Sequence, residues 1–275
     1  MGDAGPPGPL LRLVFCQSGE VGDSAPQMPG WLLDERASAG RESLDAIHVS
    51  RYDAKEDGDA LGEVRLLHGR GLGASSTVLD LGAGTGQFAL AVAPICARVV
   101  AAPVSPVMRE RLSRKVEASG HGNIDCVSAG FLTYEHSGEP VDFAYSRLAL
   151  HHLPDLWKVM ALARLGRLMR PGAVLRLWDV VYSFQPAEAE ERIEAWCATG
   201  GSAAESDWTR AELEEHVRDE HSTFTWLLEP AIERAGFRIE DAEYSPDGIF
   251  ARYVARRVEE DRPSAHRATT HAPSE

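Results

Sequence analysis

The stretch Val78-Leu79-Asp80-Leu81-Gly82-Ala83-Gly84-Thr85-Gly86-Gln87-Phe88 decides the fold of this 275-residue chain. A short apolar run ends in an acid, glycines follow, and an apolar-periodic segment comes next, an order that predicts a strand, a tight turn and a helix. Because glycine has no Cβ, the backbone of such a turn can come within contact distance of a ligand. The following helix directs its amide donors and the positive end of its dipole at the same place. The sequence therefore predicts a ligand site at this turn.

The string VLDLGAGTG resembles the cofactor loop of class I S-adenosylmethionine (SAM) dependent methyltransferases. Its glycines follow a G-x-G-x-G spacing, whereas nicotinamide-binding proteins have G-x-G-x-x-G, so an oxidoreductase is disfavoured. An alternative stays open, in which the turn serves only to pack the helix against the sheet. The resemblance implies that the methionine part of SAM lies at Asp80, Gly82, Ala83, Gly84 and Gly86.

Strand and helix patterns alternate along the chain. Strands are predicted at residues 77–81, 98–102, 124–128, 141–146, 173–181, 237–242 and 248–256, and helices at 44–54, 59–68, 87–96, 105–119, 156–169 and 223–235. Repeated strand–helix units predict an α/β fold with a doubly wound, mostly parallel, seven-stranded Rossmann-like sheet. N-terminal helices come before this sheet. A helical insertion at about residues 183–222 comes before the last helix.

The two ends of the chain differ from this pattern. Stretches rich in Gly and Pro lie on both sides of residues 10–16, so we expect residues 1–30 to be a disordered extension. The tail has no apolar periodicity, so residues 258–275 are expected to be disordered as well. Residues 31–257 are expected to form one methyltransferase-like domain. Met28 is the predicted physiological start.

The chain departs from the family pattern at two positions. Relatives usually carry an acid for the ribose hydroxyls after the second strand, where this chain has Pro103, and an acid for the adenine amino group where it has Gly130. A hydrogen bond to a charged partner contributes ~1.5–3 kcal/mol, so losing the first acid predicts SAM binding weaker by ~10- to 100-fold. Two interpretations stay open: an enzyme with weaker SAM binding, or a methyltransferase-fold binding protein that has lost methylation or uses the pocket for other chemistry. The remaining residues expected to contact SAM are Tyr52, Val104, Met108, Phe131 and Ser146.

The segment SRLALHHLPD, residues 146–155, also resembles this family, and its start would line the methionine side of SAM. His151 and His152 are the candidate catalytic residues, because a neutral imidazole near the methyl group can remove a proton from the acceptor. In the alternative, one histidine orders the loop and the other packs beneath it. Positioning alone can carry much of the rate of methyl transfer.

Aromatic residues are concentrated between the fifth strand and the last helix. They predict either the packing of a cover or the wall of an acceptor pocket that suits a flat or apolar small molecule. The residues are Phe184, Trp196, Trp208, Phe224 and Trp226, to which Trp31 and Tyr52 could add.

Composition limits the partners. A net charge of −14 disfavours nucleic acid, whose phosphates need Lys and Arg, and no apolar run reaches the ~20 residues of a membrane span. The four cysteines form no CxxC pair, so we expect reduced thiols in a cytoplasmic protein. His216 and His221 are five residues apart and face different sides of a helix, so no metal site is expected. A homodimer formed through the insertion is an open alternative to a monomer.

Overall fold

The computed structural model describes residues 29–39, 59–201 and 208–259. The chain divides into two units, Met1–Leu32 and Leu33–Glu275, and the helices and strands of the described residues all belong to the second unit. Tyr52 and the helix expected at residues 44–54 lie outside the described residues.

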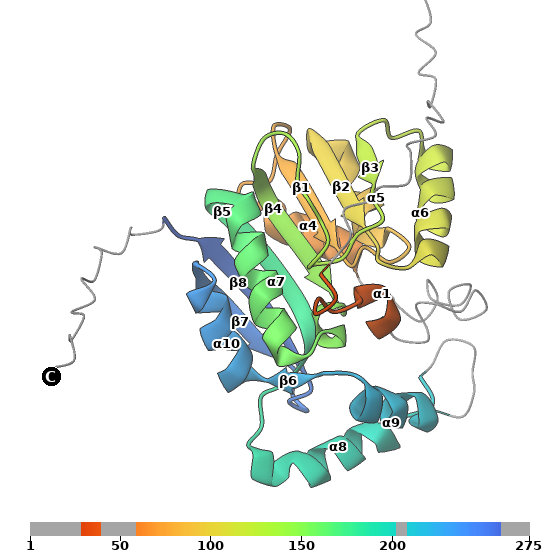
Figure 1. The fold of residues 1–275 in the computed structure, drawn as a ribbon, viewed down its shortest axis with the longest axis vertical. Helices are drawn as coiled ribbons and strands as arrows, with labels where there is room; N and C mark the ends of the chain where they lie inside the picture. Colours follow the sequence, from red (N-terminus) through yellow and green to blue (C-terminus); the bar gives the residue numbers. More distant parts are fainter. Residues whose placement is uncertain (1–28, 40–58, 202–207, 260–275) are drawn as a thin grey trace, which may run out of the picture. The chain divides into compact units, whose positions relative to one another are not determined.

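The second unit is built on a doubly wound sheet with the strand order β3-β2-β1-β4-β5-β8-β7 (Figure 1). The strands from β3 to β5 are parallel, and β8 runs antiparallel to both β5 and β7. This arrangement confirms the predicted fold class. The strands are β1 (Thr77–Leu81), β2 (Arg98–Ala102), β3 (Ile124–Cys126), β4 (Val141–Arg147), β5 (Met169–Tyr182), β6 (Thr223–Phe224), β7 (Phe237–Tyr244) and β8 (Phe250–Arg257).

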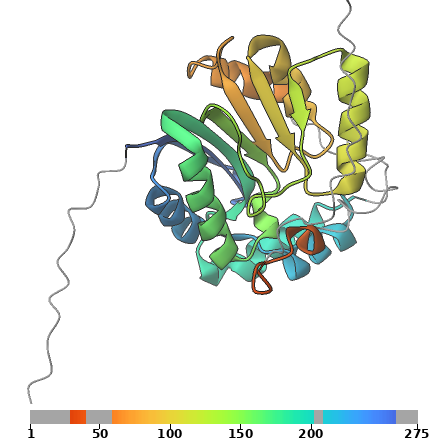
Figure 2. The ribbon, with the colours of Figure 1, turned by 45° about the horizontal axis from the view of Figure 1, so that its top comes forward.

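Helices cover both faces of the sheet. α7 (Asp155–Leu168) and α10 (Thr225–Arg234) lie on one face, and α4 (Ala60–His68) lies on the other (Figures 1 and 2). On the α4 face, Leu67, Val78 and Leu112 are fully buried in one core cluster, to which α5 (Gln87–Val92), its extension η1 (Ala93–Ile95) and α6 (Pro106–Ser119) also contribute. All five residues of β1 are buried, as expected for a central parallel strand covered on both sides. No helix in the described ranges is long and apolar enough to cross a membrane.

A buried ion pair joins α4 to the sheet. Arg176 in β5 donates two hydrogen bonds to Glu63 in α4, from Nε to Oε2 over 2.6 Å and from Nη2 to Oε1 over 2.8 Å. The two side chains are only 3% and 8% exposed. A buried charge needs such a partner, so this pair fixes how α4 sits on the sheet.

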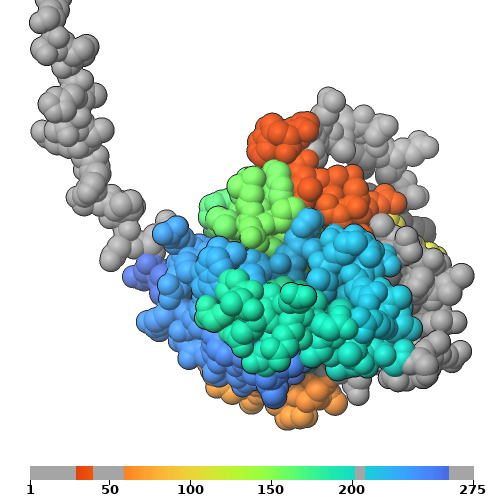
Figure 3. All heavy atoms as spheres, turned by 90° about the horizontal axis from the view of Figure 1, so that it is seen from below, coloured from red at the N-terminus to blue at the C-terminus, as the bar shows by residue number. Residues whose placement is uncertain are grey.

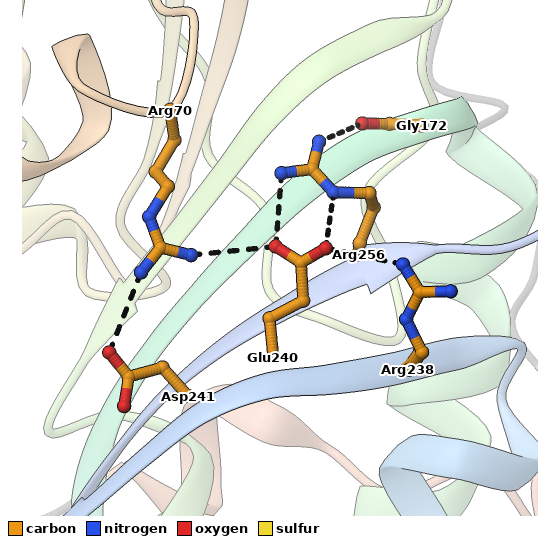
Figure 4. Close-up of polar contacts among 6 residues, drawn as sticks. All are labelled: Arg70, Gly172, Arg238, Glu240, Asp241 and Arg256. Atoms are coloured by element: carbon orange, nitrogen blue, oxygen red, sulfur yellow. Dashed lines mark hydrogen bonds and ion pairs between the residues drawn. The ribbon is translucent and has the colours of Figure 1, made fainter.

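A second network holds the β7–β8 hairpin at the sheet edge (Figure 4). The Glu240 carboxylate accepts from Nε and Nη2 of Arg256 over 2.6 and 3.0 Å, and from Arg70 over 3.4 Å. Arg256 also donates to the carbonyl oxygen of Gly172 in β5. The hairpin is thereby tied both to β5 and to the loop after α4.

At two boundaries, residues expected to be helical belong to strands. Thr223 and Phe224 were expected to be helical, but they form β6, which pairs with Val181 and Tyr182 of β5 and brings the sheet to eight strands within the described residues. A two-residue strand is too short to leave a periodic pattern. The helix expected to reach Met169 ends at Leu168, because Met169 pairs with Val141 and already belongs to β5.

The insertion forms the α8–α9 block, residues 186–219, made of η3 (Pro186–Glu188), α8 (Ala189–Ala198) and α9 (Arg210–Asp219). Viewed from below, α8 in teal and α9 in cyan form much of the visible surface (Figure 3). The aromatic rings of this region pack against one another in a second core: Tyr182 stacks on Phe184 at 5.2 Å, and Phe184 meets Phe224 edge-on at 6.0 Å. Most of the aromatic residues that the sequence analysis listed therefore pack inside this second core and do not form the wall of a pocket.

Candidate functional site

The glycine turn after β1 has the left-handed backbone that its sequence demands. Gly82, Gly84 and Gly86 have φ angles of 72°, 52° and 85°. A Cβ on Gly82 would lie 2.3 Å from the Cβ of Ala149, and one on Gly86 would lie 2.1 Å from Cδ1 of Leu112. Two of the glycines are thus required for close packing against the segment after β4 and against α6.

The environment of the Asp80 carboxyl group also indicates a ligand site. Its side chain is buried, and Oδ2 has no hydrogen-bond partner among the described residues. Burial raises the pKa of Asp80 to about 8, although the backbone N–H of Ala89 opposes this shift. Ser146 is a second buried group whose hydroxyl has no partner in the described ranges, and it lies 4.0 Å from the Cβ position of Gly82. A cationic hydrogen-bond donor placed at this turn would give the Asp80 carboxylate the partner that it lacks.

Asp80 opens on a pocket that several predicted cofactor residues share. The lining residues are Ala60, Asp80, Gly82, Ala83, Gly84, Thr85, Gln87, Phe88, Tyr145 and Arg147. Of the predicted turn residues, Asp80, Gly82, Ala83 and Gly84 line this pocket, whereas Gly86 is not among its lining residues.

Glu35 is a buried acid beside the predicted site residue Gly130, and the sequence did not indicate it. It lies in α1 (Glu35–Ser38), and its carboxylate accepts hydrogen bonds from the backbone N–H of Leu132 over 3.0 Å and the hydroxyl of Thr133 over 3.1 Å. A Cβ on Gly130 would lie 2.5 Å from the Glu35 carboxyl carbon. The carboxylate therefore occupies the space left by the missing side chain at residue 130. Burial raises the pKa of Glu35, and these hydrogen bonds oppose that shift.

The part of the site that is predicted to bind the adenosine of SAM lies between α1 and the start of α6. Pro103 is buried directly after β2, and Val104 is half-buried. Ser105 caps α6 by accepting from the backbone N–H of Met108 over 3.2 Å. A cavity of ≈ 430 Å³ lies here, and its described lining consists of Asp34, Arg36, Ala37, Pro106 and Val107. The signal that could have indicated Glu35 was Gly130 itself, because a missing acid in a ligand loop leaves room for another.

His151 is enclosed by two carboxylates. It follows β4 in η2 (Leu150–His152); its Nδ1 contacts Asp179 of β5, and its Nε2 lies 3.0 Å from Oε2 of Glu220. Burial alone would lower the pKa of His151, but the charges and hydrogen bonds of Asp179 and Glu220 raise it to about 10. Both ring nitrogens are therefore engaged, which suits a group that orders the loop.

His152 has a different environment. Burial, together with the neighbouring His151, lowers the pKa of His152 to about 3, although Glu220 and Asp179 oppose the shift. Its ring centroid is 4.3 Å from that of His151. The two candidate catalytic histidines thus lie side by side, with opposite pKa shifts.

Comparisons with known proteins indicate a methyltransferase domain and its fold. A family model described as a methyltransferase domain matches residues 78–172. An uncharacterized methyltransferase of Geobacillus kaustophilus is 24% identical over 212 residues, which are 69% of this chain and 97% of that protein. Among solved structures, a SAM dependent methyltransferase from Aquifex aeolicus has a TM-score of 0.53 at 19% identity and covers 78% of this chain and 100% of its own. The [4+2]-cyclase SpnF has a TM-score of 0.54 at 17% identity, with coverage of 72% and 80%.

The structural likenesses show the fold, and the family match places a methyltransferase domain on the strand and glycine turn that carry the site. Residues 78–172 are a methyltransferase domain, and the fold and the relative support a class I SAM-dependent methyltransferase. It is an enzyme whose cofactor is SAM. The orphaned Asp80 and Ser146 oxygens beside the glycine turn fit the charged methionine end of that cofactor.

Proposed function

We propose that this methyltransferase acts on a small-molecule acceptor. The observation that carries the proposal is the position of the α8–α9 block. The residue that caps the end of α9, Glu220, meets His151 directly after β4, so the chain's own insertion covers the carboxyl edge of the sheet. Ligands of doubly wound sheets bind at this edge, and a covered site favours an acceptor small enough to enter it. The net charge of −14 also disfavours nucleic acid.

Different residues would contact different parts of the cofactor. Bound SAM supplies a methyl group on a sulfonium, which is already activated for transfer. Asp80 and Ser146 would accept hydrogen bonds from its amino group, and the Gly82–Gly86 turn lets the backbone come close. We propose that Glu35, in the place of the missing acid at residue 130, accepts from the adenine amino group.

The roles of His151 and His152 in catalysis stay predictions. Both nitrogens of His151 face carboxylates. His152 stays neutral, but its pKa of about 3 makes it a weak proton acceptor. Holding the acceptor in line with the methyl group can supply much of the rate without a base. The cytoplasmic location and the homodimer also stay predictions.

The experiment has two stages. Calorimetric titration with SAM and S-adenosylhomocysteine measures binding, with Asp80→Asn as the variant expected to weaken it by about tenfold or more. The protein is then incubated with methyl-tritiated SAM and with separated small-metabolite, protein and nucleic-acid fractions. Label in the small-metabolite fraction alone supports the proposal. Label confined to protein or nucleic acid contradicts it while leaving the methyltransferase assignment intact.

A further inference from the structure

Three metal-binding side chains converge where α9 meets the sheet. They are His151 from η2, His216 from α9 and Glu220 at the end of α9. One nitrogen or oxygen from each lies within 4.8 Å of the other two. His216 and Glu220 are four residues apart, the spacing that places two side chains on one helix face. The pair that sequence spacing had considered, His216 and His221, is not the pair that the fold brings together.

A second layer of partners orients both imidazole rings. Nδ1 of His151 contacts Asp179, which also accepts the backbone N–H of Leu150 over 2.8 Å. Nε2 of His216 lies 2.9 Å from the hydroxyl of Ser222. The remaining nitrogen of each ring therefore faces Glu220. Metal-binding histidines have this arrangement, in which one nitrogen binds the ion and the other is held by a carboxylate or a hydrogen-bonding group.

The charges of the cluster suit a divalent cation. Asp179 and Glu220 bring two carboxylates into a buried region, and their side chains are 2% and 13% exposed. Buried carboxylates need cations beside them, and a metal ion of charge +2 would replace the proton of His151 and balance both. Two imidazoles and one carboxylate form a ligand set that suits Zn²⁺ and similar ions.

We propose that His151, His216 and Glu220 bind a divalent transition metal of the Zn²⁺ class, and that this ion fastens α9 to the carboxyl end of the sheet. Metal–ligand bonds of ~2.0–2.1 Å in a tetrahedral site place the ligand atoms roughly 3.3 Å apart. The separation of 3.0 Å between His151 Nε2 and Glu220 Oε2 is close to that value. Small side-chain movements would complete the site. His152 Nδ1 lies 3.8 Å from the same oxygen.

The test uses the full chain without a histidine tag. The protein is stripped with a chelator, titrated with Zn²⁺ or Co²⁺ and measured by mass spectrometry of bound metal and by the visible absorption of Co²⁺. We expect about one ion per chain and a tetrahedral Co²⁺ spectrum. His216→Gln and Glu220→Gln should each weaken binding at least tenfold, and Asp179→Asn, which removes the outer partner of His151, should weaken it about 10- to 100-fold.

His221→Ala is the matched control, because this histidine adjoins the cluster but its side chain is exposed. It should bind metal as the wild-type chain does. Hydrogen exchange of α9 should slow when metal is added to the wild-type chain and stay unchanged in Glu220→Gln. Wild-type protein that holds less than about a tenth of an ion per chain after titration would overturn the proposal. Equal metal affinity in wild type and in a folded His216→Gln/Glu220→Gln variant would overturn it as well.

Discussion

The carboxylate of Glu35 fills the space that a side chain on Gly130 would occupy, 2.5 Å from that residue's Cβ position. The resemblance to SAM-dependent methyltransferases leads us to expect an acid at the position of Gly130. Here the acid comes from a helix distant in sequence and is held by the backbone N–H of Leu132. Glu35 thus places a carboxylate next to Gly130, where the chain has no acid of its own.

The first prediction tests whether Glu35 and a side chain at residue 130 compete for the same space. Gly130→Asp alone places a second carboxylate against Glu35, so it should reduce the free energy of unfolding by about 1–3 kcal/mol through overpacking and repulsion. The double variant Glu35→Ala/Gly130→Asp should recover most of that loss. Urea unfolding of the two single variants and the double variant measures the coupling. Additive effects within about 0.5 kcal/mol would show that the two positions do not compete for one space.

The second prediction concerns adenine recognition. Glu35→Gln keeps the shape of the side chain but loses its charge. Affinity for S-adenosylhomocysteine should therefore fall about tenfold, which corresponds to a loss of ~1.4 kcal/mol in binding free energy. The inosine analogue lacks the exocyclic amino group, and its affinity should change little in the same variant. Calorimetry with both ligands separates recognition from general loss of structure. An equal loss for both ligands would contradict a specific contact with the amino group.

A third prediction follows from the pKa of Asp80, which burial raises to about 8. The folded state of the free protein holds this proton at pH 7, while the unfolded chain, with a pKa near ~3.9, does not. Stability should therefore fall as pH rises from about 4 to 8, by at most ~1.4 kcal/mol per pH unit from this group. Urea unfolding between these limits measures the slope, and Asp80→Asn should flatten it.

Binding of SAM should release the same proton, because the ligand's ammonium group favours the ionised carboxyl group. Calorimetry at pH 7 in buffers of different ionisation enthalpy counts the protons. About one should be released by the wild-type chain, fewer at pH 9 and none by Asp80→Asn. A release of equal size in the Asn variant would assign the proton to another group.

The fourth prediction compares two glycines with similar backbone angles. Gly86 and Gly120 have φ angles of 85° and 73°, but a Cβ on Gly86 would meet Leu112 at 2.1 Å, whereas nothing lies within 4 Å of one on Gly120. Gly120→Ala should cost only the backbone strain of about 1–2 kcal/mol. Gly86→Ala should cost about 1–3 kcal/mol more from overpacking, and it should also weaken SAM binding. Equal costs in thermal or urea unfolding would mean that the packing around Leu112 is loose.

Local features were predictable from the sequence because their signals are local. The strand and turn from Thr77 to Gly86 need only an apolar run and glycines, and the structure has both where the pattern indicates them. The contacts that complete the sites join distant segments. Glu35 and Leu132 are 97 residues apart, and no spacing rule connects them. His151 similarly meets Glu220 only because β4, β5 and the α8–α9 block are placed together by the whole fold.

The last prediction tests the buried pair between Glu63 and Arg176. Each side chain is less than a tenth exposed, so Glu63→Gln leaves the Arg176 guanidinium buried without a compensating charge and should cost about 3–5 kcal/mol. Replacing both residues by apolar ones, Glu63→Leu/Arg176→Met, removes the charges together and should recover most of that loss. Urea unfolding at constant pH measures both variants and the wild-type chain. A double variant as unstable as Glu63→Gln would mean that α4 is held by the geometry of the paired hydrogen bonds, which apolar packing cannot replace.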